Sequence, residues 1–535
     1  KDSQTEPRRN LCSLTRHISI LEQFTFRNPK RIRRDADQKM GCCAGKLQFH
    51  KETKRQDKNE YLAAARAVEK GAGLTQNVHM DMGRPLTDYY INASHNTYLY
   101  GDQLTSASTP LAVSRALQLG IRVVELDCYD TTTKAKVCVT HGGTLCTAAP
   151  FAAFIQAVKQ NAFVASDYPV ILTLENHCKA NGQQFIADTL RSVLGDALYV
   201  PSGDGVPSPQ DLMGKVVIRD KHREDDKEEQ QTTPQKPKRR VAPNVAAELD
   251  SEVLSPTKLR EVRSQLSSQN DPVTPYEAPS TTLRALIGIR NVKTKYDKTT
   301  KTFVTDDGES STGVASSSFG EAKFKSLVAS HPQCAAALSE WCRSRLARIY
   351  PAGHRVDSSN YDPSLSWALG CQVVALNCQA KDSDEQLYVN YGKFLANGRC
   401  GYVLKPEYLR GEACQTFAAK AIEKTLPVRA SLKITIQGAK GWTGGWGREK
   451  TPDVYCRARV AGGPPQDCRD WWKTKTVQNS VAPQWDAEFT QALAAPELCV
   501  VVLECWDDDT VTGDDFLGTV AVPLAEVASG KQLDL

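Results

Sequence analysis

Four apolar segments between residues 89 and 177 share one feature: each ends on side chains that can bind a metal ion or transfer a proton. Their short length and their content of Val, Ile, Leu and Tyr are typical of buried β-strands. Any one of these ends alone would be an ordinary strand terminus, but four in succession indicate one shared site. The groups concerned are His95 with Asn96, Glu125 with Asp127, His141, and Glu175.

Glu125 and Asp127 stand two positions apart, so on a β-strand both carboxylates point to the same face. Two like charges on a buried face repel each other, and desolvation costs each of them roughly several kcal/mol. A divalent cation between them removes both costs. With Asn96 and Glu175 they form an all-oxygen donor set, which favours Ca²⁺ or Mg²⁺ over Zn²⁺. The two histidines then remain available for proton transfer or charge stabilisation.

The order of the segments predicts an α/β barrel. Between residues 84 and 221 apolar strands alternate with helix-like segments, which is the pattern of a parallel sheet with right-handed crossovers. We expect five strands there, ending near Ile91, Leu126, Val139, Leu174 and Ile218. Three more are expected at 283–292, 371–376 and 401–404, which completes the eight of a barrel. In such barrels the chemistry gathers at the carboxyl ends of the strands, which is where the groups above fall.

Longer motifs give the chain a family resemblance. SHNTY, VELDCYD, THGGT and PVILTLENHC, in this order, resemble the catalytic X half of eukaryotic phosphoinositide-specific phospholipase C. SSSFGE, LARIYPAGHRVDSSNYDP, GCQVVALN and GYVLKP resemble its Y half, and the residues after about 430 resemble a C2 domain. The resemblance implies a distorted TIM barrel, split by a linker and followed by an all-β C2 sandwich, as in a compact protist or plant-like member.

This division gives five expected regions. They are an N-terminal extension (1–83), the X half (84–221), a charged disordered linker (222–280), the Y half (281–425) and the C2 domain (430–535), which ends before its last expected strand. The linker is rich in charged residues, Ser, Thr and Pro, so it cannot form a core. In relatives this linker shields the active site, so it is autoinhibitory here, contacts lipid through its basic run 236–240, or is a tolerated surface insertion.

The resemblance also implies roles for single residues. An active-site Ca²⁺ would lie on Asn96, Glu125, Asp127 and Glu175. Glu125 or Glu175 would accept the proton of the inositol 2-hydroxyl, and His95 would donate a hydrogen bond to the phosphoryl oxygen. His141 would protonate the diacylglycerol oxygen and then activate water to open a cyclic phosphate. The headgroup positions of the family are matched by Arg219, Lys221, Ser318, Arg348 and Tyr350.

Arg219 departs from the pattern, because close relatives have Lys at this position. A guanidinium still neutralises a phosphate, but it does so with a planar fork rather than a point charge. The preference among phosphoinositides therefore stays open at the level of the sequence.

A second calcium site is expected in the C2 domain. The loop 506–516 holds carboxylates too densely to be stable without cations, and in calcium-binding C2 domains the matching positions are ligands. Those positions are Asp453, Asp507, Asp509 and Asp515, whereas a further first-loop aspartate of many such domains is replaced by Gly447. Bound calcium would bridge the domain to anionic lipid. The alternative is an acidic loop that binds no metal.

The N-terminal extension contains a lipidation motif, subject to where translation starts. If Met40 is the start, Gly41 is open to myristoylation and Cys42 and Cys43 to palmitoylation, and the lysines that follow would contact anionic lipid. Gly45 stands where the motif prefers Ser or Thr. The alternative is an ordinary internal Met-Gly followed by two thiols.

Composition and charge limit the partners. A net charge of +5 is too even to indicate a nucleic-acid-binding protein, although a local basic patch could meet an anionic membrane. The 17 cysteines form no C-x-x-C pair, which favours reduced thiols in the cytosol. We therefore expect a cytoplasmic protein, peripheral on the cytoplasmic face of the plasma membrane, whose partners are phosphoinositide lipids.

Two functions from different classes follow. The first is a calcium-dependent phospholipase C that converts phosphatidylinositol 4,5-bisphosphate, and phosphatidylinositol, into inositol phosphate and diacylglycerol during intracellular signalling. The second is a catalytically silent adaptor that binds phosphoinositides and membranes. Both catalytic histidines and all four metal-ligand positions are present, which favours the enzyme.

Overall fold

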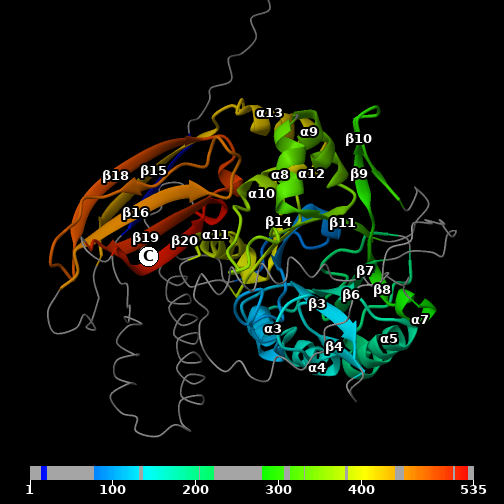
Figure 1. Cartoon of the computed structure of the whole chain (residues 1–535). Coiled ribbons are helices and arrows are strands. Elements are labelled where there is room, and N and C mark those ends of the chain that lie inside the picture. Colours follow the sequence, from blue (N-terminus) through cyan, green and yellow to red (C-terminus); the bar gives the residue numbers. More distant parts are fainter. Residues whose placement is uncertain are drawn as a thin grey trace, which may run out of the picture.

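The computed structural model describes residues 14–20, 77–131, 136–203, 205–221, 280–306, 314–330, 332–379, 384–439, 451–509 and 513–527. An α/β barrel lies beside an all-β sandwich in this part of the chain (Figure 1). Gly41, Cys42, Cys43, Gly447 and nearly all of the expected linker fall outside the described residues.

Eight parallel strands form a closed ring. Each strand is buried on both faces, so Val, Ile and Leu dominate it except where side chains reach the mouth of the barrel. In ring order the strands are β2 (Tyr89–Ser94), β3 (Val123–Asp130), β6 (Val170–Asn176), β7 (Val216–Lys221), β8 (Ile287–Asn291), β11 (Val314–Gly320), β12 (Leu346–Tyr350) and β13 (Val373–Leu376). The ring closes where β2 pairs with both β13 and β3.

The expected number of barrel strands is confirmed, but two members of the expected set are wrong. The strand near Val139, β4 (Val137–Val139), pairs antiparallel with β3, and β14 (Tyr402–Leu404) pairs antiparallel with β2, so both flank the barrel. Their places are taken by β11 and β12, neither of which is a continuous apolar run. The polar residues that interrupt them, Ser316, Ser318 and Arg348, belong to the site described below.

Helices cover the outside of the barrel, as the alternating pattern predicted. The helix α3 begins with Pro110 at its first position, and the Thr109 side chain accepts a hydrogen bond from the Leu111 backbone N–H, an arrangement that favours a helix start. The covering helices are α3 (Pro110–Gln118), α4 (Phe151–Asn161), α5 (Ala180–Leu194), α7 (Thr281–Arg284), α8 (Glu321–Ser330), α9 (Pro332–Trp341), α10 (Ser364–Ala368), α11 (Glu385–Phe394), α12 (Glu407–Arg410) and α13 (Cys414–Glu423). Two short strand pieces complete this part: β5 (Ala149–Pro150) beside β4, and the hairpin of β9 (Thr294–Asp297) and β10 (Thr302–Thr305).

The sandwich consists of two sheets whose inner faces share one core. Its strands are β15 (Ala430–Gly438), β16 (Val454–Ala461), β17 (Trp472–Lys473), β18 (Gln484–Leu493), β19 (Val500–Asp507) and β20 (Asp515–Pro523). In β15 buried and half-buried residues alternate strictly, which is the pattern of a strand with one face on a core. A strand of the N-terminal extension, β1 (Leu14–Ile20), pairs in parallel with β15. No described helix of the protein is long and apolar enough to span a bilayer.

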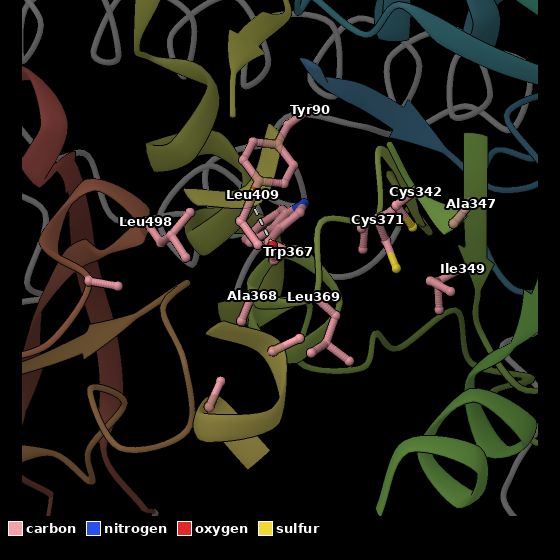
Figure 2. Packing of buried hydrophobic residues seen from close by; sticks show 14 of the residues in the cluster. Tyr90, Cys342, Ala347, Ile349, Trp367, Ala368, Leu369, Cys371, Leu409 and Leu498 are labelled. Atoms are coloured by element: carbon pink, nitrogen blue, oxygen red, sulfur yellow. Dashed lines mark hydrogen bonds between the residues drawn. The ribbon is translucent and has the colours of Figure 1, made fainter. Parts of the chain in front are cut away.

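The Y half and the sandwich share a second core (Figure 2). Leu498 of the sandwich reaches the cluster around Trp367 and Leu409 of the barrel, and the Tyr90 hydroxyl donates to the Trp367 carbonyl oxygen over 2.7 Å. The helix α11 lies against β19 and β20. Gly392 of this helix permits the close approach, because a Cβ built there would lie 2.5 Å from Val500 Cγ1 and 2.7 Å from Ala521 Cβ.

We predict that Gly392→Ala destabilises the protein. Helix propensity alone would make this change stabilising by about 1 kcal/mol, whereas overpacking a close-packed contact costs roughly 1–3 kcal/mol. Because the nearest atoms include an Ala521 backbone carbon at 3.3 Å, we expect the contact to outweigh the propensity. Denaturant unfolding measures the difference. Gly353→Ala is the control, because no atom lies within 4 Å of a Cβ there; a stabilised Gly392→Ala would contradict the packing argument.

Candidate active site

Three carboxylates meet at the carboxyl end of the barrel. Glu125 and Asp127 point inward from β3, and Glu175 follows on the neighbouring strand β6, directly opposite Asp127 in the register. One oxygen from each lies within 4.8 Å of the others. Glu125 and Asp127 are buried, whereas Glu175 is exposed, so the cluster opens toward solvent on one side.

The electrostatics of this cluster are those of a cation site. Burial raises the pKa of Asp127 well above its usual range, and Glu175 and Glu125 raise it further. The Tyr98 hydroxyl donates to Asp127 Oδ2 over 2.6 Å, whereas Asp127 Oδ1 is buried without a hydrogen-bond partner. Across the cluster, a hydrogen bond from His177 lowers the pKa of Glu175 to about 2. An orphaned carboxylate oxygen among three oxygen donors fits a hard divalent ion such as Ca²⁺.

Asn96 lies beside these carboxylates in the turn after β2, with a backbone φ of 44°. Its backbone N–H donates to Glu125 Oε2 over 3.0 Å, and its side-chain Nδ2 donates to Gln103 Oε1 over 2.9 Å. A positive φ is tolerated by Asn better than by most residues, which explains why an amide can occupy this turn. The four expected metal-ligand positions are therefore close together.

The two expected catalytic histidines are both held through Nδ1. His95 Nδ1 lies 2.8 Å from Asn377 Oδ1, and His141 Nδ1 lies 2.7 Å from the backbone oxygen of Gln103. The His95 ring lies parallel to the Tyr350 ring, with centroids 6.1 Å apart, and burial lowers the pKa of His95. Because Nδ1 is engaged in each ring, Nε2 is the atom left to act on a substrate.

Three of the expected headgroup residues are cations on barrel strands: Arg219 and Lys221 lie on β7 and Arg348 lies on β12, and we call them the cationic wall. Arg219 Nη2 donates to Ser318 Oγ over 2.8 Å and to Asn291 Oδ1 over 3.0 Å, while its Nε donates to Ser316 Oγ over 3.0 Å. Burial lowers the pKa of Arg219 to about 9. Lys221 follows two residues later on the same face of β7.

Arg348 connects the cationic wall to the carboxylate cluster. Its Nη2 lies 2.6 Å from both carboxylate oxygens of Glu125, and its guanidinium carbon lies 5.1 Å from the centre of the Tyr350 ring. Both partners of this ion pair are almost fully buried, with 6% and 3% of their side chains exposed. The pair therefore supplies the counter-charge for Glu125 within the protein itself.

Sequence reasoning missed the amides and hydroxyls that hold these groups: Gln103, Asn291, Ser316 and Asn377. They carry no charge and are common in loops and strands alike, so only their positions within or near recognised motifs could have indicated them. The motif GCQVVALN, for example, ends on Asn377.

The expected C2 ligands also come together. The Asp453 backbone N–H donates to Asp507 Oδ1 over 2.7 Å, and burial raises the pKa of Asp507, with Asp509, Asp453 and Asp515 adding to the effect. Three carboxylates that raise the proton affinity of a fourth, Asp507, again fit a cation site. This cluster lies at one end of the sandwich, between β16, β19 and β20.

Comparison with known proteins agrees with this geometry. The model of the phosphatidylinositol-specific phospholipase C X domain matches residues 82–222, that of the Y domain matches 291–408, and that of the C2 domain matches 430–535. Phosphoinositide phospholipase C 6 of Arabidopsis thaliana is 31% identical over 85% of this chain and 75% of its own length. The delta-4 phosphodiesterase of phosphatidylinositol 4,5-bisphosphate from Bos taurus is 32% identical over 85% of this chain and 59% of its own.

The crystal structure of L. pealei PLC21 is similar over 85% of this chain, with a TM-score of 0.66 and 29% identity, and this chain spans about half of its length, 54%. The chain therefore belongs to the phosphoinositide-specific phospholipase C family, and it is an enzyme of the phosphodiesterase class.

We predict that Arg348→Met strongly destabilises the protein in chelator, because it leaves the buried Glu125 carboxylate without its counter-charge. Breaking a buried ion pair in this way costs roughly 3–5 kcal/mol. Denaturant unfolding measures the loss. The matched control is Arg343→Met. Its ion pair with Glu340 is similarly short, 2.7 Å, but about a third of each side chain is exposed. An exposed pair contributes about 0–1 kcal/mol, so equal losses in the two variants would contradict the assignment.

Proposed function

We propose that this protein is a calcium-dependent phosphoinositide phospholipase C that cleaves phosphatidylinositol 4,5-bisphosphate and phosphatidylinositol. The observation that carries the proposal is the pairing of an all-oxygen carboxylate cluster with a cationic wall across one barrel mouth. A cluster that suits a divalent cation and a wall that suits phosphate together describe a site for a phosphorylated, anionic substrate. The relatives named above are phospholipases of this kind, which supports the same reaction here.

Asn96, Glu125, Asp127 and Glu175 would hold the calcium ion. When bound, the ion lowers the pKa of a coordinated hydroxyl and neutralises charge that develops on phosphate oxygens. The cations of the cationic wall, Arg219, Lys221 and Arg348, match ring phosphates by charge. Ser318 and Tyr350 would contact the inositol ring.

The protein's own groups then move the protons. Glu125 or Glu175 accepts the proton of the inositol 2-hydroxyl as this oxygen attacks phosphorus. With the anionic substrate bound, His95 takes up a second proton from solvent at Nε2 and donates a hydrogen bond from it to the phosphoryl oxygen. His141 delivers a proton from Nε2 to the departing diacylglycerol oxygen. In the second step His141 takes a proton from the water that attacks phosphorus, and the carboxylic acid formed in the first step returns its proton to the inositol 2-oxygen as the cyclic phosphate opens to inositol phosphate. Each proton-transfer role contributes roughly 10²–10⁴ in rate.

The test is calcium-dependent release of water-soluble inositol phosphate and diacylglycerol from mixed vesicles of phosphatidylinositol and its 4,5-bisphosphate. Wild-type protein should release both products with calcium and neither with chelator. The ratio between the two lipids shows whether Arg219 preserves a preference for the bisphosphate. No release, with headgroup binding retained, would favour the silent adaptor instead.

We predict that His141→Ala lowers turnover by roughly 100-fold or more, because the leaving oxygen loses its proton donor. Calcium and vesicle binding should remain at the wild-type level, since His141 is not among the expected ligands. His79→Ala is the control, because this histidine is exposed and pairs with Glu526, away from the barrel mouth. Near-normal turnover of His141→Ala would refute its role.

For the sandwich, we propose that calcium on Asp453, Asp507, Asp509 and Asp515 attaches the protein to an anionic membrane, which for this family places it at the cytoplasmic face of the plasma membrane. The proposal rests on the mutual carboxylate repulsion seen at Asp507.

The double variant Asp507→Asn, Asp509→Asn should then lose calcium-dependent sedimentation with anionic vesicles, by at least about tenfold in affinity. It should still cleave a soluble short-chain substrate, since the barrel is unchanged. Asp188→Asn, Asp196→Asn removes two exposed carboxylates of the barrel and is the control. Undiminished vesicle binding of the first variant would identify the acidic loop as one that binds no metal.

A further inference from the structure

Hydrogen bonds join three amide side chains of the candidate site into a chain. Asn96 Nδ2 donates to Gln103 Oε1 over 2.9 Å, and Gln103 Nε2 lies 3.3 Å from Asn377 Oδ1. Asn377 Oδ1 is also the atom that His95 Nδ1 contacts, at 2.8 Å. The chain therefore joins an expected metal ligand to an expected phosphate-binding histidine, and its middle member, Gln103, is 6% exposed.

Two backbone carbonyls anchor the direction of every hydrogen bond in this chain, because a carbonyl oxygen can only accept. Asn377 Nδ2 donates to the Ser359 carbonyl over 3.2 Å, so Asn377 must turn Oδ1 toward His95 and Gln103. The Ser358 hydroxyl donates to the Gly101 carbonyl over 2.8 Å, so it accepts from Gln103 Nε2, also over 2.8 Å. With Nε2 fixed as the donor, Gln103 presents Oε1 to Asn96.

The consequences reach both sides of the reaction. Asn96 must place Nδ2 on Gln103, which leaves its Oδ1 as the atom available to a cation. His95 must carry a hydrogen on Nδ1, so that Nε2 is the atom presented to a substrate. Gln103 also acts through its backbone oxygen, which accepts from His141 Nδ1 over 2.7 Å and imposes the same arrangement on that ring.

We propose that Gln103 is a positioning residue that orients the metal ligand Asn96 and, through Asn377, fixes the tautomer of His95. This inference rests on the proposed function, which makes Asn96 a calcium ligand and His95 a phosphate-binding group. In this role Gln103 contacts neither substrate nor metal, and it acts only through its neighbours. Partners of this kind typically change metal affinity by roughly 10–100-fold when removed.

The test compares Gln103→Leu with Asn377→Leu, both in the Asp507→Asn, Asp509→Asn background so that calcium binding reports the barrel alone. Gln103→Leu should weaken calcium binding, measured by calorimetry, by roughly 10–100-fold. Asn377→Leu should leave calcium affinity within about threefold, because it breaks only the His95 end of the chain. Gln183→Leu is the control: this buried glutamine is likewise held by its side-chain amide, which donates to the Cys178 carbonyl, but it lies on α5 outside the barrel.

The second measurement needs no calcium. The ¹⁵N chemical shifts of the His95 ring, assigned by loss of the signal in His95→Gln, should show the hydrogen on Nδ1 in wild-type protein and a mixture of tautomers in Gln103→Leu and Asn377→Leu. A neutral His95 ring with its hydrogen on Nε2 in substrate-free wild-type protein would overturn the proposal. So would Gln103→Leu with unchanged calcium affinity and His95 shifts, or with losses no larger than those of Gln183→Leu. Wild-type protein that binds no calcium in the barrel would overturn the proposed function, whereas the tautomer result would still stand.

Discussion

Three carboxylates held together at the mouth of a barrel are the constraint on which the surrounding structure depends. In a buried setting such charges repel each other strongly, and desolvation opposes ionisation of each one. Two features reduce this repulsion. Arg348 neutralises Glu125 directly, and Glu175 is exposed to solvent and lies beside His177. The cationic wall and the amide chain contact this carboxylate cluster, through Arg348 and Asn96 respectively.

The sequence allowed the architecture to be predicted because hydrophobic runs determine barrel strands. It failed at β11 and β12, where the inward-facing positions hold Ser316, Ser318 and Arg348 instead of Val or Ile. The same polar positions that form the site therefore hide the strands that carry it. The short apolar run of β4 was misleading for the opposite reason, since a flanking antiparallel strand is buried as thoroughly as a barrel strand.

The candidate site divides in a similar way. Charged and histidine residues could be predicted from motifs, because their chemistry is visible in a single letter. The supporting amides could not, since Gln103 and Asn377 are separated by 274 positions and gain their meaning only when the barrel closes. A neutral amide is also common in loops, so its type alone excludes nothing. Such neighbours decide which ring nitrogen of a histidine carries the hydrogen.

The core shared by the Y half and the sandwich has a thermodynamic consequence. Leu498 and Val500 of the sandwich and Trp367 and Leu409 of the barrel lie in one cluster, so separating the two parts would expose apolar surface on both. Their unfolding is therefore expected to be cooperative, as a single calorimetric transition rather than two. By linkage, any ion that binds only the folded sandwich then raises the melting temperature of the barrel as well, although that ion does not touch the barrel.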